Sequence, residues 1–306
     1  MKQIPSSILM VRPDYFGYNT ETAKTNTFQK EKLLCENHHI RQSARHEFEV
    51  LVSLLKKNGI QVYVFDSPKH VHAPDAVFPN NWISFHEDGT VILYPMLTEN
   101  RRVERNADIT SELDKYFRIS GIIDLTKEEK KGRILEGTGS IVFDHINKFA
   151  YANESPRTNK HLFYDVCEKL GFEGIFFKAT NEQGVNIYHT NVLLTIGEGY
   201  AVICKECIDK ADVDKVINNL YASGLEVIDI SHEQMNHFAG NMIELKSKDN
   251  KNYLVMSDGA FAALTEDQKN RLAKYVDFLH SDLQTIESVG GGSARCMIAG
   301  IHLERK

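Results

Sequence analysis

The chain has 306 residues, 42% hydrophobic and 25% charged, with a formal net charge of −6, which suits a globular protein and argues against nucleic acid or an anionic membrane as main partner. No apolar run approaches the ~20 residues of a membrane helix, and we find no secretion signal at the start. Five thinly spread cysteines suit reduced thiols, so we expect a cytoplasmic protein.

The N-terminal part of the chain shows two elements. A strand is expected at Ser7–Pro13 and a helix at His39–Gly59, where apolar residues recur at helical spacing. No hairpin signal lies between or directly before them, so we expect this strand and helix to form part of a unit that another segment of the chain completes.

Four β-hairpins follow, each with two β-rich runs around a polar turn. The first has an Asp-Gly turn within His86–Gly89, a strong hairpin signal. The expected hairpins are Asn81–Met96, Ser140–Ala152, Asn191–Cys204 and Asn241–Ser257.

A helix is expected after each hairpin, at residues 101–117, 158–170, 208–222 and 265–280. Thr265 is a plausible cap for the fourth, and an Asp stands near the start of the third. Short strands such as Phe172–Ala179 and Gly224–Ser231 follow the helices.

The turn centres fall near residues 88, 146, 198 and 249, a spacing of roughly 50–60 residues that is typical of repeat architectures. One further period reaches a C-terminal strand near residue 301. We therefore expect a single α/β domain over residues 1–306, a five-bladed α/β propeller of ββαβ modules whose fifth module is closed by the N- and C-terminal segments. A two-layer α/β sandwich with accidental spacing is the alternative.

Chemically active side chains stand just before the hairpins, at equivalent positions of the repeat. They are Asp75, Glu136, His189 and, after three glycines, Cys296. Equivalent positions of a cyclic array gather around its axis, and a thiol, an imidazole and a carboxylate form the minimal set for nucleophilic catalysis. The glycines allow close backbone approach beside the thiol.

These residues belong to ordered motifs: "PDAVF" at Pro74–Phe78, "RR-x-E" at Arg101–Glu104, "LEG" at Leu135–Gly137, "S-x-RTN" at Ser155–Asn159, "H-x-N" at His189–Asn191 and the C-terminal "GGG…C". Together they resemble the guanidine-modifying enzyme superfamily, which includes arginine deiminases, dimethylarginine hydrolases and amidinotransferases and has the five-bladed pentein fold. "VRPDYFGYN" and "PDAVFPNNW" look like its branch of citrulline-hydrolysing, amidinotransferase-related proteins.

The resemblance implies a hydrolase of carbon–nitrogen bonds other than peptide bonds, with no cofactor. Cys296, His189 and Glu136 would be catalytic. Arg101 and Arg157 would hold the α-carboxylate of an amino-acid substrate through paired guanidinium–carboxylate hydrogen bonds.

Two departures from the family pattern bear on the substrate. Guanidinium-binding members place carboxylates where this chain has Asn81 and Asn191. Amides suit a neutral ureido group, which needs both donors and acceptors, so we expect Asp75, Asn81 and Asn191 to bind citrulline. We expect the Cys296 thiolate, beside protonated His189, to form an S-carbamoyl enzyme and release ornithine, ammonia and carbon dioxide. The other interpretation makes both asparagines turn residues.

Three other functions remain open. The first is a deiminase or dihydrolase of arginine or a methylated arginine, the second an amidinotransferase, and the third a non-catalytic propeller that binds a macromolecule. Oligomeric state is open too, and a homodimer is compatible with the sequence.

Two motifs have metal-ligand spacing. "CKEC" at Cys204–Cys207 lacks a second Cys or His pair at zinc-finger distance, so we expect it to end a strand and begin a helix. His70 and His72 in "HVHAPD" are expected to lie in a loop. The sequence therefore predicts no metal.

Overall fold

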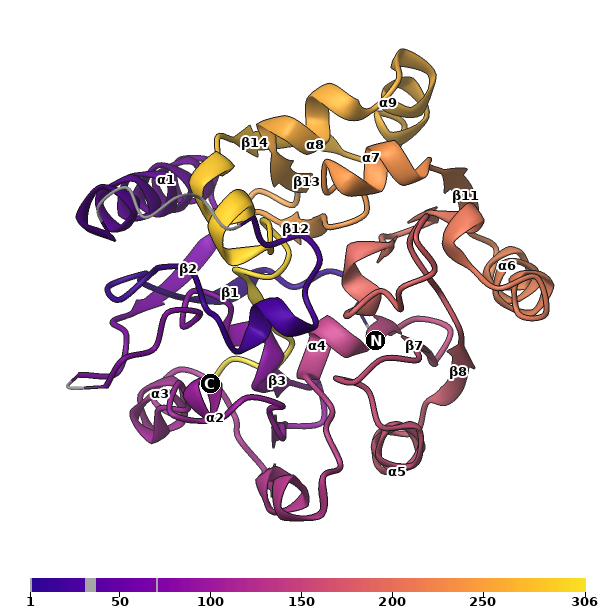
Figure 1. Cartoon of the computed structure of the whole chain (residues 1–306). Coiled ribbons are helices and arrows are strands. Elements are labelled where there is room, and N and C mark those ends of the chain that lie inside the picture. Colours follow the sequence, from indigo (N-terminus) through magenta and orange to yellow (C-terminus); the bar gives the residue numbers. More distant parts are fainter. Residues whose placement is uncertain (1, 31–36, 70) are drawn as a thin grey trace.

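A computed structural model of the chain describes residues 2–30, 37–69 and 71–306. Helices lie around the outside and strands nearer the centre, in units that follow one another along the chain (Figure 1). No helix in these ranges is both long and apolar enough to cross a membrane.

Three sheets of three strands share one pattern. In each, an antiparallel hairpin is extended by a third strand that runs parallel to the hairpin's second strand. A parallel neighbour needs a crossover connection, and a helical segment supplies it each time. The strands are β6 (Val142–Asp144), β7 (Phe149–Asn153) and β8 (Glu173–Phe177); β9 (Leu194–Ile196), β10 (Tyr200–Ile203) and β11 (Glu226–Asp229); and β12 (Ile243–Lys246), β13 (Asn252–Ser257) and β14 (Asp277–Ser281).

A fourth sheet has six strands in the order β2-β1-β15-β3-β4-β5 and contains the same pattern twice. One half is β3 (Ile83–Phe85), β4 (Thr90–Leu93) and β5 (Gly121–Asp124). The other joins the two ends of the chain, because β15 (Ala299–Ile301) pairs antiparallel with β1 (Ser7–Val11), which pairs parallel with β2 (Gln61–Phe65). The halves meet where Ile301 of β15 pairs with Phe85 of β3.

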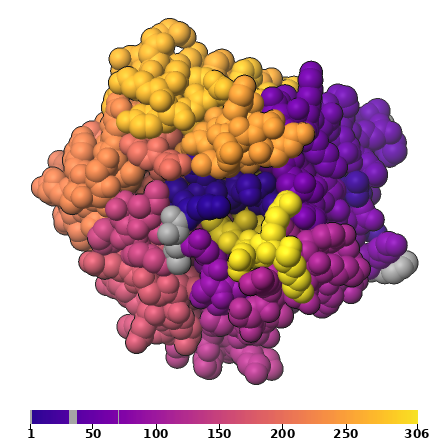
Figure 2. Space-filling view, turned by 180° about the vertical axis from the view of Figure 1, so that it is seen from behind, coloured from indigo at the N-terminus to yellow at the C-terminus, as the bar shows by residue number. Residues whose placement is uncertain are grey.

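Neighbouring units touch in chain order. β6 contacts β9, β9 contacts β12, and the Lys246 N–H at the end of β12 donates to the Pro5 carbonyl at 3.1 Å. The side chain of Gln3 donates to the carbonyls of Phe143 and Ile196, which belong to two different sheets. The first residues of the chain thus cross the centre of the rear face beside the C-terminal residues (Figure 2).

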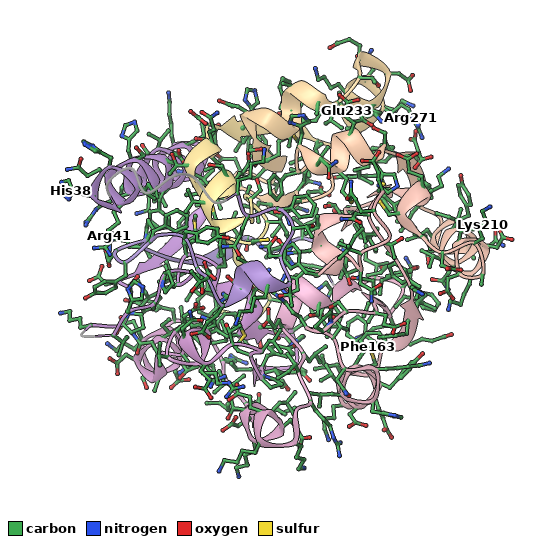
Figure 3. All side chains as sticks on the ribbon, viewed as in Figure 1. His38, Arg41, Phe163, Lys210, Glu233 and Arg271 are labelled. Atoms are coloured by element: carbon green, nitrogen blue, oxygen red, sulfur yellow. The ribbon has the colours of Figure 1, made fainter. Side chains whose placement is uncertain are left out.

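The outer helices are amphipathic. In α5 (Lys160–Leu170), the Asn159 side chain caps the first turn by accepting from the Leu162 N–H at 3.0 Å, and Gly171 ends the helix with a φ of 68°. Phe163 on its inner face is fully buried, whereas Lys210 and Arg271 lie at the periphery (Figure 3). The other helices are α1 (Asn37–Lys57), α2 (Glu99–Arg102), α3 (Ala107–Leu113), α4 (Gly137–Ser140), α6 (Val213–Ala222), α7 (His232–Asn236), α8 (Asp258–Ala263) and α9 (Glu266–Leu272).

Most of the predicted elements are confirmed. All four hairpins form at the predicted turns, both terminal strands pair, and the order strand–strand–helix–strand repeats. Thr265 caps α9 in a reciprocal capping box with Gln268.

Three details were wrong. The predicted helix 101–117 is split into α2 and α3, because Asn106 caps a new helix. The predicted helix 265–280 stops at Leu272, since the residues from Asp277 onward pair with β13 as strand β14. The predicted helix 208–222 begins later, as α6 at Val213, and the side chain of its N-cap residue Asp212 makes no cap but accepts from the Lys178 N–H at 2.9 Å.

The pairing of the chain ends should be a major source of stability. Ile301 is 3% exposed and packs between β1 and β3, so Ile301→Ala should lower the free energy of unfolding by about 2–5 kcal/mol. Denaturant titration measures this. The control Ile122→Ala changes a strand isoleucine that is 51% exposed and should cost under about 0.5 kcal/mol, so equal losses would contradict the terminal closure.

Candidate active site

Residues from six parts of the chain line one small, almost filled cavity. Six of the residues predicted from the sequence are among them: Asp75, Asn81, Arg101, Arg157, His189 and Cys296. The other two, Glu136 and Asn191, lie one hydrogen bond behind them. The expected convergence is therefore present.

The glycine segment brings the thiol to this cavity. After a π-helical turn at Ile286–Gly290, Gly291 adopts a φ of 66°, and a side chain there would collide with Asn26. The Gly291 carbonyl accepts hydrogen bonds from the Tyr188 hydroxyl at 2.5 Å and from the Asn26 side chain at 3.1 Å. Gly291 thus lets two other segments close against the loop that presents Cys296.

Two amide groups surround the Cys296 sulfur. The side-chain nitrogens of Asn241 and Asn191 lie 3.3 and 3.5 Å from Sγ. Burial raises the pKa of the Cys296 thiol, and these two donors oppose that rise without cancelling it. The resting sulfur is therefore protonated at neutral pH.

His189 is paired with a buried carboxylate. Its Nε2 lies 2.9 Å from Oε2 of Glu136, which also accepts from Nη1 of Arg157 at 3.3 Å. Burial alone would raise the pKa of Glu136, but the charge of Arg157 and the His189 hydrogen bond hold it well below its ordinary value. Because an ionised carboxylate only accepts, Nε2 carries the hydrogen and Nδ1 is left as an acceptor.

The resting protonation state differs from our expectation. Burial lowers the pKa of His189 to about 4, despite the nearby Glu136. With the thiol pKa raised as well, the ligand-free site holds a neutral thiol and a neutral imidazole rather than a thiolate–imidazolium pair. Both residues line the same cavity, and the unprotonated nitrogen of the imidazole is Nδ1.

Asp75 presents an unused oxygen. Its Oδ2 accepts from the Asn19 amide at 2.7 Å and the Thr22 hydroxyl at 3.1 Å. Oδ1 is buried and has no hydrogen-bond partner among the described residues. Burial raises the pKa of Asp75, although the positive charge of Arg101 opposes the change. A buried polar atom facing a cavity calls for a partner from a ligand.

Arg101 is held by the protein itself. Glu104 accepts two of its hydrogen bonds, both at 2.9 Å, and Oδ1 of Asn81 accepts a third at 2.7 Å. The Asn81 amide donates to Oδ1 of Asn80 at 2.9 Å. Both predicted ligand-binding residues are thus engaged with protein partners in this structure.

Arg157 is held less tightly than Arg101, because only one of its described protein partners is charged. Besides Glu136, it donates to the Thr22 carbonyl and to the Thr25 hydroxyl, and its guanidinium lies 4.9 Å from the ring centre of Tyr188. Both threonines belong to the segment that covers the cavity. Arg157 therefore ties this covering segment to the buried carboxylate of Glu136.

The sequence did not reveal several residues of the site. Asn19, Thr22 and Asn26 come from the N-terminal segment, which lies before the first repeat; Asn19 ends the motif "VRPDYFGYN", but nothing in that motif assigned it to the site. Asn241 stands at a repeat-equivalent position in "FAGN", so the period could have indicated it.

The structure places the two motifs that have metal-ligand spacing in different surroundings. Cys204 follows β10 and Cys207 ends a short 3-10 turn at Lys205–Cys207, broadly as expected. His72 lies in an irregular segment, whereas His70 lies outside the described residues. His232, however, lies beside the two cysteines, which the spacing did not indicate.

A family model for eukaryotic N,N-dimethylarginine dimethylhydrolases matches residues 12–303. The chain belongs to this family. It is thereby a member of the guanidine-modifying superfamily, as its motifs predicted, and the expected class of hydrolases acting on carbon–nitrogen bonds agrees with it. None of the curated proteins compared with the chain matches it.

Solved structures share the fold at low sequence identity. The apo structure of ArgZ, an arginine dihydrolase of the cyanobacterial ornithine-ammonia cycle, has a TM-score of 0.76 at 17% identity, covering 96% of this chain and 40% of that one. The chain thus spans well under half of full-length ArgZ. The substrate-bound N-terminal domain of ArgZ gives 0.74 at 17% identity, covering 95% and 96% of the two chains. A dimethylarginine dimethylaminohydrolase adduct with S-methyl-L-thiocitrulline gives 0.61 at 14% identity, covering 99% and 100%. At these identities the likeness concerns the fold, which is α/β of the pentein type.

The raised thiol pKa predicts how Cys296 reacts. Because only the thiolate reacts with iodoacetamide, alkylation should be slow at pH 7 and should keep rising above pH 9. Asn241→Ala removes a donor to the thiolate and should slow alkylation about tenfold at a fixed pH.

Peptide mass spectrometry resolves the rate at Cys296 from those of other cysteines. Asn270→Ala, an exposed position on α9, should leave the rate unchanged. A rate that levels off below pH 8 would contradict the assigned protonation state.

Proposed function

We propose that the chain is a cysteine-dependent hydrolase that converts citrulline to ornithine, ammonia and carbon dioxide. The observation that supports citrulline is the pair of amide groups of Asn191 and Asn241 beside the Cys296 sulfur. When Sγ attacks a ureido carbon, the carbonyl oxygen becomes an oxyanion next to the sulfur and needs donors there. Amide donors meet this need, and one such donor is typically worth 10²–10³ in rate.

The remaining polar groups suit the rest of the ureido group. Of the described residues that line the cavity, Asp75 alone carries a carboxyl group, and its free Oδ1 can accept a ureido N–H. The charges of Arg101 and Arg157 are matched by Glu104 and Glu136, so a neutral head group adds no unpaired charge. Asn81 also lines the cavity, and its Oδ1 accepts a hydrogen bond that fixes the guanidinium of Arg101.

The reaction then proceeds in two stages. Nδ1 of His189 takes the Cys296 proton as Sγ bonds to the ureido carbon, and Glu136 stabilises the imidazolium. The imidazolium protonates the ornithine amine as its carbon–nitrogen bond breaks, which leaves an S-carbamoyl enzyme. His189 next deprotonates water, which releases the thiol and carbamate, and the carbamate decomposes to ammonia and carbon dioxide.

Arg157 is our proposed anchor for the substrate α-carboxylate. Two of its three protein partners are neutral oxygens of the covering segment, which a carboxylate can replace with stronger, charge-assisted hydrogen bonds. Arg101, gripped by Glu104, then acts as a positioning residue for Asn81 rather than as a second anchor.

We also propose how the units are arranged and where in the cell the protein is located. The five three-stranded units would form one closed five-bladed α/β propeller over residues 1–306, with the site at one end of its axis. The described cysteines are free, which supports a cytoplasmic location.

Arginine or a methylated arginine is the second candidate substrate. The family model and the arginine dihydrolase ArgZ support it, and the free Oδ1 of Asp75 suits a guanidinium as well. The cavity between these buried side chains is small, which favours a single amino acid over a macromolecule.

A substrate panel tests the proposal. The protein is incubated with citrulline, arginine, dimethylarginine, agmatine and carbamoylputrescine, and ammonia and the amine product are measured. Citrulline should be consumed and carbamoylputrescine, which lacks the carboxylate, should not.

Cys296→Ser should abolish turnover and keep binding. Consumption of arginine alone would refute the citrulline assignment, and product formation that depends on an added amine would indicate amidino transfer.

A single substitution tests the role of the amides. Asn191→Asp replaces a donor beside Sγ with a carboxylate, so kcat/KM for citrulline should fall about 10²–10³-fold while the arginine-to-citrulline ratio of kcat/KM rises. The matched control is Asn270→Asp on the exposed face of α9, which should change neither value. Undiminished citrulline turnover in Asn191→Asp would make Asn191 a turn residue only.

A further inference from the structure

A second cluster of reactive side chains lies outside the active site. Cys204 follows β10, Cys207 closes the next turn, and His232 opens α7. The two sulfurs and an imidazole nitrogen all lie within 4.8 Å of one another. The Cys207 sulfur is 3.4 Å from Nδ1 of His232 and 3.4 Å from the thioether sulfur of Met235.

We propose that Cys204, Cys207 and His232 bind one Zn²⁺ ion as a structural site that joins the end of β10 to α7. Two thiolates and an imidazole are a preferred donor set for zinc, and the fourth position is left to water or to the Met235 sulfur beneath the site. Two thiolates also neutralise the charge of the ion, which reduces the cost of burying it.

The burial pattern suits a site of this kind. Cys204 and Cys207 are 0% and 2% exposed, whereas His232 is half-buried. The thiolates are thus shielded from solvent, while the imidazole side offers a route for the ion. An entry path and ligands on separate segments are both expected of a metal that stabilises a fold.

The backbone around the ligands is already organised. Ser231 and Gln234 form a reciprocal capping box that fixes the first turn of α7, where His232 stands. The His232 N–H donates to the carboxylate of Glu206, a residue between the two cysteines. The histidine and the cysteine turn are therefore linked without the metal, which lowers the ordering cost of binding.

A dithiol that forms a disulfide is the competing explanation. The two sulfurs are 2.6 Å apart. Zinc thiolates with bonds of about 2.3 Å in tetrahedral geometry place their sulfurs about 3.8 Å apart, so ion entry must separate them by about 1 Å. A disulfide, however, would give no role to the imidazole and the thioether that converge on the same sulfur from α7.

Zinc at this site would also hold in place the start of a segment that leads to the active site. Met235 and His232 belong to α7, and the chain continues from there to Phe238 and Asn241. The Phe238 ring lies 5.2 Å from that of Phe28, and Asn241 contacts the Cys296 sulfur. The zinc proposal itself does not depend on which substrate the enzyme uses.

Zinc titration of the full chain tests the proposal. The protein is stripped with a chelator, kept reduced, and titrated with Zn²⁺ against a competing dye, in a Cys296→Ser background that removes the other thiol–imidazole pair. One Zn²⁺ per chain should bind and raise the Tm. Cys207→Ala and His232→Ala should each weaken binding at least tenfold and abolish the rise in Tm. With Co²⁺, a thiolate-to-metal charge-transfer band should appear and be lost in Cys207→Ala.

Two matched controls keep the test specific. Cys167→Ala removes another buried thiol, on α5, and His237→Ala removes an exposed histidine that follows the other end of α7. Both should bind zinc as the unsubstituted protein does. Absence of zinc binding, equal binding in Cys207→Ala and His232→Ala, or a Cys204–Cys207 disulfide that persists under reducing purification would each overturn the proposal.

Discussion

The buried carboxylate of Glu136 is the group on which the site depends. Its Oε2 accepts from His189 and Arg157 and lies 3.9 Å from Arg101, while Oε1 accepts from the Leu97 N–H at 3.1 Å. These partners come from three other parts of the chain. The charge of Arg157 is thereby compensated, and the neutral imidazole is held in place, among buried side chains. Removing this one negative charge would leave the buried Arg157 without a charged partner, which is far more costly than losing a surface ion pair.

Much of the architecture could be predicted because it repeats. Hairpin turns such as His86–Gly89 carry local signals, and their regular spacing placed Glu136, His189 and Cys296 at equivalent positions before any contact was known. The errors lie where tertiary pairing overrides local pattern. The predicted helix from Thr265 runs on past Leu272 in the sequence pattern, yet the next residues gain more by completing a sheet with β13.

The hydrogen-bond partners could not be predicted in the same way. The motifs indicated that Arg101 and Asn81 lie near the site. Only the structure shows that the guanidinium of Arg101 already donates hydrogen bonds to Glu104 and Asn81. Asn19 and Thr22 reach Asp75 from a segment that shares no period with the rest. His232 approaches Cys207 because β10 and α7 are neighbours in space, not in sequence. Contacts of this kind depend on how units pack, which no motif encodes.

The resting protonation state explains how such a site remains intact between turnovers. A sulfur that is protonated because burial disfavours its thiolate is a poor target for oxidants and electrophiles, which react with the charged form. The imidazole is kept neutral by the same burial, so one of its nitrogens remains unprotonated. In the mechanism that we propose, proton transfer from Cys296 to His189 creates two opposite charges in a buried cavity, so we expect it to be favourable only when Sγ bonds to a substrate carbon. The negative charge then passes to an oxygen beside the amides of Asn191 and Asn241, while Glu136 faces the new imidazolium. Burial thus suppresses the reactivity of the thiol without substrate and confines it to the moment of attack.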